Sequence, residues 1–217
     1  MTKNIAIDGP AGAGKSTIAK IVAKKLGFIY VDTGAMYRAM ALYMIRKGVD
    51  INDTEAISAA AAGADIEIRY EDGVQCVILN GENVNDRIRT PEVSDAASKT
   101  SVVKEVRARL VALQQELAAK TSVVMDGRDI GTKVLPDAYL KVFMTASADV
   151  RAKRRYDENK AKGMECDLEK IRQEIIERDN RDMTRSESPL VKAWDAVELD
   201  TSDLTINEVA DKIISMI

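Results

Sequence analysis

A glycine-rich segment near the start of the chain constrains the fold more than any other stretch. It matches the phosphate-binding pattern GxxxxGK[ST] at every fixed position and reads Gly9-Pro10-Ala11-Gly12-Ala13-Gly14-Lys15-Ser16. An apolar run at 4–8 precedes it, and residues 16–26 have the apolar spacing of a helix that Gly27 ends. This order of strand, loop and helix predicts a site where backbone N–H groups and a helix N-terminus bind phosphate.

Each residue of this segment has an expected part in binding ATP. Lys15 is expected to reach the outer phosphates as a point charge, and the Ser16 hydroxyl is expected to bind Mg²⁺. The alternative is a glycine-rich turn that binds nothing, which the full motif in its strand and helix context disfavours. The residues predicted to bind ATP are Gly9, Pro10, Ala11, Gly12, Ala13, Gly14, Lys15, Ser16 and Thr17.

Composition narrows the possible classes of protein. The chain has 217 residues, of which 46% are hydrophobic, enough for one core with insertions. A net charge of −3 provides no general attraction to nucleic acid. Because histidine is absent, no mechanism can use an imidazole base or a histidine-bound metal. No apolar run approaches the length of a membrane span, and no signal peptide is evident, so we expect a cytoplasmic monomer.

Apolar runs alternate with helical patterns along most of the chain. Five runs have strand length, at 4–8, 28–31, 122–126, 139–144 and 196–200. This alternation predicts an α/β fold with a parallel sheet and helices on both faces. Residues 65–70 and 74–79 instead alternate with period two around Asp72-Gly73, which predicts a small antiparallel insert.

The reaction class follows from what accompanies the phosphate-binding loop. The only Asn-Lys pair, Asn159-Lys160, is followed by Ala-Lys, so the base-reading motif of regulatory GTPases is missing. The chain is also too short for a large motor or transporter ATPase. A small phosphotransferase remains.

Arginines supply the second indication of phosphate chemistry. Arg178, Arg181 and Arg185 are spaced i, i+3, i+7 and share a helix face, while Arg38 and Arg128 lie at or near the ends of predicted strands. Guanidinium groups bind phosphate bidentately and can stabilise the charge of a transferred phosphoryl group. A second group consists of Arg151, Arg154 and Arg155. The alternative, a solvated charged face, is preferred for Arg172, Lys153 and Lys170.

The absence of histidine bears on the acceptor. A nucleoside monophosphate has a second pKa of about 6, so it is mostly a dianion at neutral pH and needs no general base. A sugar hydroxyl acceptor usually needs one, although an Asp could serve. Positioning and fixed cations could then provide most of the catalysis.

Four segments together carry a resemblance to a known family. They are Gly9–Ser16, Asp32-Thr33-Gly34-Ala35-Met36-Tyr37-Arg38, Asp126-Gly127-Arg128-Asp129-Ile130-Gly131-Thr132 and Arg178-Asp179-Asn180-Arg181-Asp182. The chain resembles the bacterial cytidylate kinase family over essentially its whole length. The resemblance implies transfer of the γ-phosphoryl group of ATP to CMP or dCMP, with Mg²⁺ and without any nucleic-acid polymer or membrane as partner.

The resemblance also implies an architecture. It is a P-loop NTPase fold with a five-stranded parallel sheet in the order 2-3-1-4-5, a small antiparallel β insert and a short helical lid. The single domain of 1–217 would comprise a core at 1–32, 120–150 and 164–217, and a monophosphate-binding region at 33–119. Within these, the insert is expected at about 64–88 and the lid at 151–163.

Site roles carry over from the resemblance residue by residue. Arg128, Arg181 and Arg185 join Lys15 as catalytic residues, and Arg154 and Arg155 of the lid would contact ATP. Cytosine offers an amine donor to a carboxylate such as Asp129 and acceptors to a guanidinium such as Arg107. The full set implied to bind CMP is Thr33, Arg38, Ser98, Arg107, Arg128, Asp129, Arg178, Asp182 and Arg185.

Two other functions stay open at this stage. One is a kinase for another nucleoside monophosphate or a small hydroxyl acceptor, which a substrate panel separates from the first reading. The other is a nucleotide-sensing module, which would bind ATP with negligible turnover.

Overall fold

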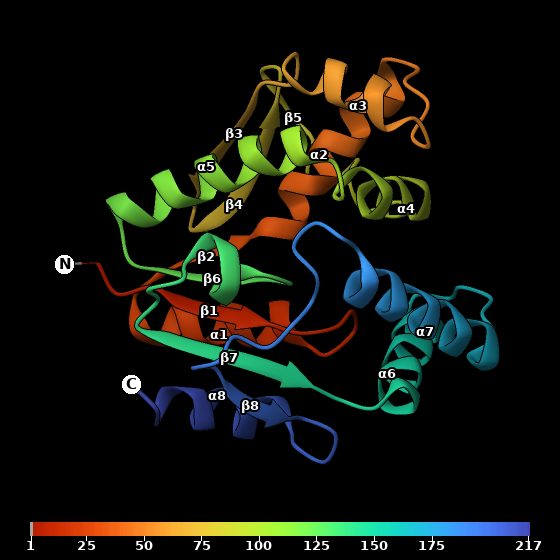
Figure 1. Ribbon diagram of the computed structural model, residues 1–217. Helices are drawn as coiled ribbons and strands as arrows, with labels where there is room; N and C mark the ends of the chain where they lie inside the picture. Colours follow the sequence, from red (N-terminus) through yellow and green to blue (C-terminus); the bar gives the residue numbers. More distant parts are fainter. Residues whose placement is uncertain (1) are drawn as a thin grey trace. The chain divides into compact units, whose positions relative to one another are not determined.

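The computed structural model describes residues 2–217. By its internal contacts the chain divides into two compact units, one made of residues 1–30 and 122–217 and the other of residues 31–121. Each is described separately below, with element labels as in Figure 1. The division falls inside β2, the second strand of the main sheet.

The first unit is built on a five-stranded sheet. Its strands are ordered β2 (Ile29–Asp32), β6 (Val123–Gly127), β1 (Ile5–Asp8), β7 (Leu140–Thr145) and β8 (Val197–Asp200). β1 pairs in parallel with both β6 and β7, and β7 pairs in parallel with β8. In chain order of the core strands this is 2-3-1-4-5, so the predicted sheet is confirmed.

Helices of this unit follow the strands, and local sequence explains where several begin. They are α1 (Lys15–Leu26), a π-helical turn η1 (Ile130–Val134), α6 (Ala148–Ala161), α7 (Leu168–Thr184) and α8 (Ile206–Ile214). Ser147 and Asp167 accept backbone hydrogen bonds at the starts of α6 and α7. Thr205 and Glu208 form a capping box at the start of α8, as the sequence Thr205-Ile206-Asn207-Glu208 indicates.

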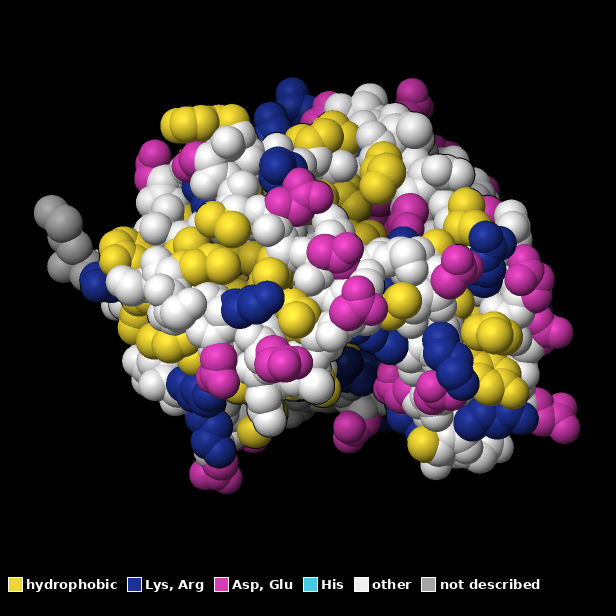
Figure 2. All heavy atoms as spheres, turned by 90° about the horizontal axis from the view of Figure 1, so that it is seen from below, with side chains coloured by type: hydrophobic (Ala, Val, Ile, Leu, Met, Phe, Trp, Pro, Cys, Tyr) yellow, Lys and Arg dark blue, Asp and Glu magenta, His cyan; other side chains and the backbone are white. Residues whose placement is uncertain are grey.

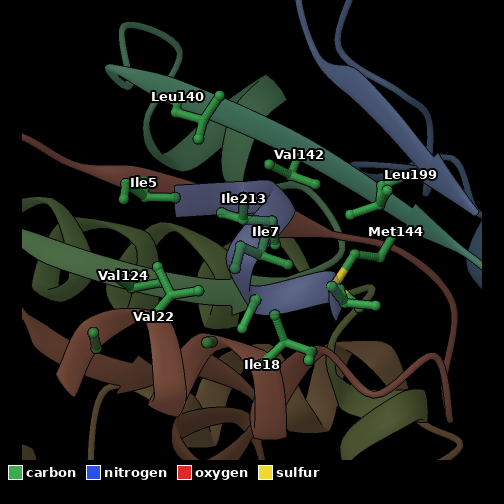
Figure 3. Packing of buried hydrophobic residues seen from close by; sticks show 14 of the residues in the cluster. Ile5, Ile7, Ile18, Val22, Val124, Leu140, Val142, Met144, Leu199 and Ile213 are labelled. Carbon is green, nitrogen blue, oxygen red and sulfur yellow. The ribbon is translucent and has the colours of Figure 1, made fainter. Parts of the chain in front are cut away.

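The core of this unit lies between β1 and its neighbouring strands and two helices (Figure 3). Ile5, Ile7 and Met144 from the strands are fully buried, and they share this core with Ile18 from α1 and Ile213 from α8. α1 packs against β6 and α8. Because both faces of the sheet are covered at its centre, the central strand β1 is a continuous apolar run that ends at its first acid, Asp8.

The second unit combines four helices with a small sheet. Its helices are α2 (Thr33–Arg46), α3 (Thr54–Ala61), α4 (Pro91–Thr100) and α5 (Lys104–Lys120). The sheet has the order β3 (Ile66–Glu71), β4 (Val74–Leu79) and β5 (Glu82–Asn83), and both of its pairings are antiparallel. Asp72 and Gly73 have positive φ at the turn between β3 and β4, so the predicted hairpin is confirmed.

Some of these elements differ from the sequence expectation. The helix expected from about residue 35 begins at Thr33, because the Asp32 carboxylate accepts a hydrogen bond from the Ala35 N–H and caps it. The π-helical turn after Asp129 has no counterpart in the prediction. Within residues 2–217, none of the helices is both long and apolar enough to span a membrane.

Candidate functional site

The phosphate-binding loop connects β1 to α1 and depends on glycine at three positions. Gly9, Gly12 and Gly14 have φ of 146°, 78° and 84°, backbone angles that residues other than glycine rarely adopt. At Gly9 the space is closed as well, since an added Cβ would lie 2.1 Å from the Met144 carbonyl oxygen of β7. The loop therefore forms because glycine allows its backbone to turn and to approach the neighbouring strand.

Lys15 is almost completely buried at the start of α1. Its ammonium group donates a hydrogen bond of 2.7 Å to the Pro10 carbonyl oxygen, across the loop. Burial lowers the pKa of Lys15 well below its usual value, and the nearby Arg128 charge lowers it further, while Asp126 and Asp8 oppose this. The ammonium is thus held inside the loop by the Pro10 carbonyl oxygen and is almost completely shielded from water.

Ser16 and Asp126 bring two oxygen donors together beside the loop. The Ser16 hydroxyl donates to Asp126 Oδ2 at 2.8 Å, and the Tyr30 hydroxyl donates to Oδ1, also at 2.8 Å. Asp126 is the second-last residue of β6 and is buried. Hydroxyl and carboxylate oxygens are the ligands that Mg²⁺ takes from proteins, so the donor set suits this ion.

Asp8 holds the segment that follows Asp129. Its carboxylate accepts hydrogen bonds from the N–H groups of Ile130 at 2.8 Å and Gly131 at 2.7 Å. Burial raises the pKa of Asp8 to about 6, although these two hydrogen bonds and the charge of Lys15 lower it. The last residue of β1 thereby fixes the turn η1 and with it the position of Asp129.

A cavity of about 560 Å³ opens beside the loop within the first unit. Its wall includes the predicted ATP-binding residues 12–17 and both Arg154 and Arg155, but not Gly9, Pro10 or Ala11. Figure 2 shows dark-blue Lys and Arg side chains in a recess of the surface, in keeping with this basic lining. Residues 12–17 and the two arginines are therefore brought together around one space.

The two arginines of the expected lid are placed differently from one another. Arg154 donates to the carbonyl oxygen of Thr201 at 2.6 Å and to its hydroxyl at 3.3 Å, so it joins α6 to the segment before α8. Arg155 is half-buried in the cavity wall. Arg151, grouped with them by spacing, also lines the cavity, but it is buried and paired with Asp179 of α7 at 2.6 Å.

Several predicted acceptor residues of the first unit surround Asp182. Arg128 Nε donates to Asp182 Oδ2 at 2.9 Å. Burial alone would raise the pKa of Asp182, but the charges of Arg128, Arg178 and Arg185 outweigh it and hold this pKa below its usual value. Arg185 Nε donates to the Ser188 carbonyl oxygen at 2.7 Å. Of the remaining predicted residues, Asp129 is buried and Arg181 is exposed on α7.

The second unit carries the other predicted acceptor residues. Thr33 is buried in the first turn of α2, and Arg38 Nη2 donates to Asp32 Oδ2 at 3.1 Å. Arg38 Nε is buried without a hydrogen-bond partner among residues 2–217, which leaves one donor of its guanidinium available. This cluster lies where α2 begins and suits an anionic group.

Arg107 and Ser98 lie elsewhere in the same unit. Arg107 is buried, donates to the Ser101 carbonyl oxygen at 3.2 Å and lies 5.4 Å from the centre of the Tyr37 ring. Ser98 is half-buried on α4, and its carbonyl oxygen accepts a hydrogen bond from the Ser101 hydroxyl. Both residues therefore make hydrogen bonds to Ser101, and the burial of Arg107 shows that it is not a solvated helix residue.

Two residues in these clusters have no role in the sequence-based prediction. Asp8 was recognisable as the first acid after the β1 apolar run. Gln75 gave no signal, because its contacts depend on how β4 packs. Its side-chain amide accepts from the Asp32 N–H at 2.8 Å and donates to the Asp32 carbonyl oxygen at 3.2 Å. Gln75 thereby secures the backbone directly before Thr33.

Two solved structures with similar folds cover nearly the whole chain at low sequence identity. An uncharacterized protein from Eubacterium ventriosum has a TM-score of 0.54 at 15% identity and covers 100% of this chain and 98% of its own. A shikimate kinase from Bacteroides thetaiotaomicron has a TM-score of 0.50 at 14% identity, covering 99% of this chain and 97% of its own. At such identities the likeness concerns the fold alone.

Sequence relatives are much closer. A cytidylate kinase from Caldicellulosiruptor saccharolyticus is 53% identical over 213 residues, 98% of this chain and 94% of that protein. A cytidylate kinase from Bacillus cereus is 51% identical over 214 residues, 99% of this chain and 95% of that protein. The family model described as cytidylate kinase matches residues 5–217. This chain belongs to the cytidylate kinase family.

Proposed function

We propose that this protein transfers the γ-phosphoryl group of ATP to CMP or dCMP, giving ADP and CDP or dCDP. The observation that carries the proposal is the complete phosphate-binding loop opening on a basic cavity, in a chain of the cytidylate kinase family. The cavity volume of about 560 Å³ lies within the range of small-molecule and cofactor sites.

The donor half of the reaction uses the first unit. N–H groups of residues 12–17 and the Lys15 ammonium bind the ATP phosphates, and the negative charge that Lys15 meets there favours its protonated form. Ser16 and Asp126 would hold Mg²⁺, which neutralises phosphate charge when bound. Arg154 and Arg155 close the far wall of the cavity as part of the lid proposed at 151–163.

The acceptor half uses arginines and polar groups from both units. Arg38 and Thr33 of the second unit are assigned to the CMP phosphate. Arg128 and Arg185 of the first unit are assigned to the same group, and Arg181 adds positive charge for the transfer. These guanidinium groups stabilise charge that spreads over the oxygens of the moving phosphoryl group. The CMP phosphate is a dianion near neutral pH, so it attacks without a general base.

Recognition of the base and sugar completes the proposed acceptor site. Asp129 accepts a hydrogen bond from the cytosine amine, while Arg107 and Ser98 meet its acceptor edge. Uracil presents the reverse pattern at these positions, so its monophosphate leaves polar groups unpaired and is a poor substrate. Arg178 and Asp182 contact the sugar.

An acceptor panel tests this function. ADP formation from Mg-ATP is measured with CMP, dCMP, UMP, AMP, GMP and no acceptor, at equal concentrations. The proposal expects strong turnover with CMP and dCMP and only weak turnover with the others. Preference for another monophosphate would remove the base-reading roles of Ser98, Arg107 and Asp129. If the rate of ADP formation were the same with and without each acceptor, the assignment as a kinase would be wrong.

A further inference from the structure

Arg151 is the most heavily engaged buried cation in the described part of the first unit. Its Nε donates to the Ala146 carbonyl oxygen at 2.8 Å, and its Nη1 donates to the Ala11 carbonyl oxygen at 3.0 Å. Nη1 and Nη2 also bind the Asp179 carboxylate at 3.1 and 2.6 Å. These contacts use four of the five guanidinium N–H donors, so Arg151 has little left for a phosphate.

One of these contacts reaches the backbone of the phosphate-binding loop. A peptide group is planar, so holding the Ala11 carbonyl also fixes the direction of the Gly12 N–H, a donor of the loop. The Arg151 stem is close as well, since a Cβ on Gly12 would lie 3.4 Å from Arg151 Cβ. The loop is therefore supported by α6 at Gly12, one of the loop positions where the backbone needs a positive φ.

The carboxylate that holds Arg151 belongs to α7, the helix that also carries Arg178 and Arg181. Asp179 follows Arg178 directly and precedes Asp182 by three residues on α7, so the two acids share a face. Asp182 pairs with Arg128, while Asp179 pairs with Arg151. Both acids are buried, which makes each pair sensitive to the loss of one partner.

From these contacts we propose that Arg151 is a positioning residue for phosphoryl transfer. Anchored by Asp179 of α7, the Arg151 guanidinium fixes the orientation of the Ala11–Gly12 peptide in the phosphate-binding loop. Arg151 thereby links this loop to α7. This rests on the proposed function for its relevance to catalysis, but its effect on ATP binding does not depend on the acceptor. Arg151 touches no reacting atom in this role.

Substitution of Arg151 by Lys tests the proposal, because Lys keeps the charge but cannot make four directed hydrogen bonds. Calorimetry with Mg-ATP and no acceptor should show binding weakened about ten-fold, as expected when loop donors are misplaced. The KM for ATP should rise in step, while the KM for CMP at saturating ATP stays within about two-fold. The matched control is Arg172→Lys, since Arg172 also joins α7 to α6, through Asp149, but on the surface.

Thermal melting separates positioning from a merely structural role. If Arg151→Lys lowers the melting temperature but keeps the parental ATP affinity and KM values, the role of Arg151 is only structural and the proposal is overturned. If Arg151→Lys does not fold, Asp179→Asn replaces it, because the isosteric amide removes the negative charge that anchors the Arg151 guanidinium against Ala11. Weaker Mg-ATP binding in Asp179→Asn would then support the proposal, and unchanged binding would overturn it. A failed acceptor panel alongside weakened ATP binding would contradict only the proposed function.

Discussion

Three ionisable side chains, Lys15, Asp8 and Asp126, lie buried where β1 and β6 meet the phosphate-binding loop. Burying any one of these charged groups alone would lower the stability of the fold, because burial disfavours a charge that has no partner. Asp8 and Asp126 raise the pKa of Lys15, and the charge of Lys15 lowers that of Asp8. The cluster therefore holds a cation in place before substrate arrives, with its orientation fixed by the Pro10 carbonyl.

Replacement of Lys15 by Ala should lower kcat for every acceptor by a similar factor, at least about 100-fold, because the lost charge acts on the donor phosphates. Steady-state rates with CMP and dCMP would measure it. The relative preference for acceptors should be that of the parent. If Lys15→Ala changed only the KM for CMP, Lys15 would act on the acceptor, and its assignment to the ATP phosphates would be wrong.

Asp8 should titrate near pH 6, well above its ordinary pKa of 3.8. Because the fold favours the protonated carboxyl, the stability that Asp8 contributes is complete below pH 3.8 and is lost as pH rises through about 6. Carbon-13 NMR of the Asp carboxyl groups should show one midpoint near 6 that Asp8→Asn removes. An Asp8 midpoint near 4 would show that the site is better solvated than its burial implies.

Asp129→Ala should cost about 2–3 kcal/mol in kcat/KM for CMP, the penalty of leaving a polar partner unpaired. The KM for ATP should stay close to the parental value, because Asp129 is assigned to the base and not to the donor. Asp137→Ala, at an exposed position nearby in the chain, is the matched control. Equal kcat/KM for CMP in parent and variant would refute the assignment.

At the scale of elements, local rules predicted where most helices and strands lie. Ser147, Asp167 and Thr205 cap helices where the sequence places capping residues, and the apolar runs became the core strands. Contacts between distant elements were beyond such rules. The burial of Arg151 depends on Asp179, 28 residues away, and nothing in its spacing separates it from Arg154. Likewise η1 forms because Asp8 binds its backbone, 122 residues along the chain.

Glycines of the phosphate-binding loop give an element-scale prediction. Gly9→Ala should destabilise the protein and abolish Mg-ATP binding, because the new methyl group would overlap the β7 backbone at Met144. Gly27→Ala is the matched control, since it also has positive φ but an open surrounding, and should cost only about 1 kcal/mol. Chemical denaturation and calorimetry would measure both. If both variants lost the same free energy of unfolding and the same Mg-ATP affinity, backbone strain at positive φ would explain the effect of Gly9→Ala, and overlap with β7 would not.

At the scale of the whole molecule, the sheet order and the family were predictable, because four motifs spread along the chain carried them. The predicted site residues divide between the units, with Thr33, Arg38, Ser98 and Arg107 in the second and the rest in the first. The supporting contacts of Gln75 and Asp8 were not predictable, since an amide or acid in a strand has many possible partners until packing selects one. The sequence thus indicated the chemistry more fully than the contacts that support it.

The most direct test of the account is a competition among acceptors. The protein is mixed with Mg-ATP carrying oxygen-18 in its γ-phosphoryl group and with equal amounts of CMP, UMP, AMP and GMP. Products are read by mass spectrometry, because in such a mixture they form in the ratio of their kcat/KM values. The account predicts CDP as the main diphosphate formed from these acceptors, with the label in its terminal phosphoryl group. Labelled UDP or GDP as the main product, or labelled inorganic phosphate alone, would contradict it.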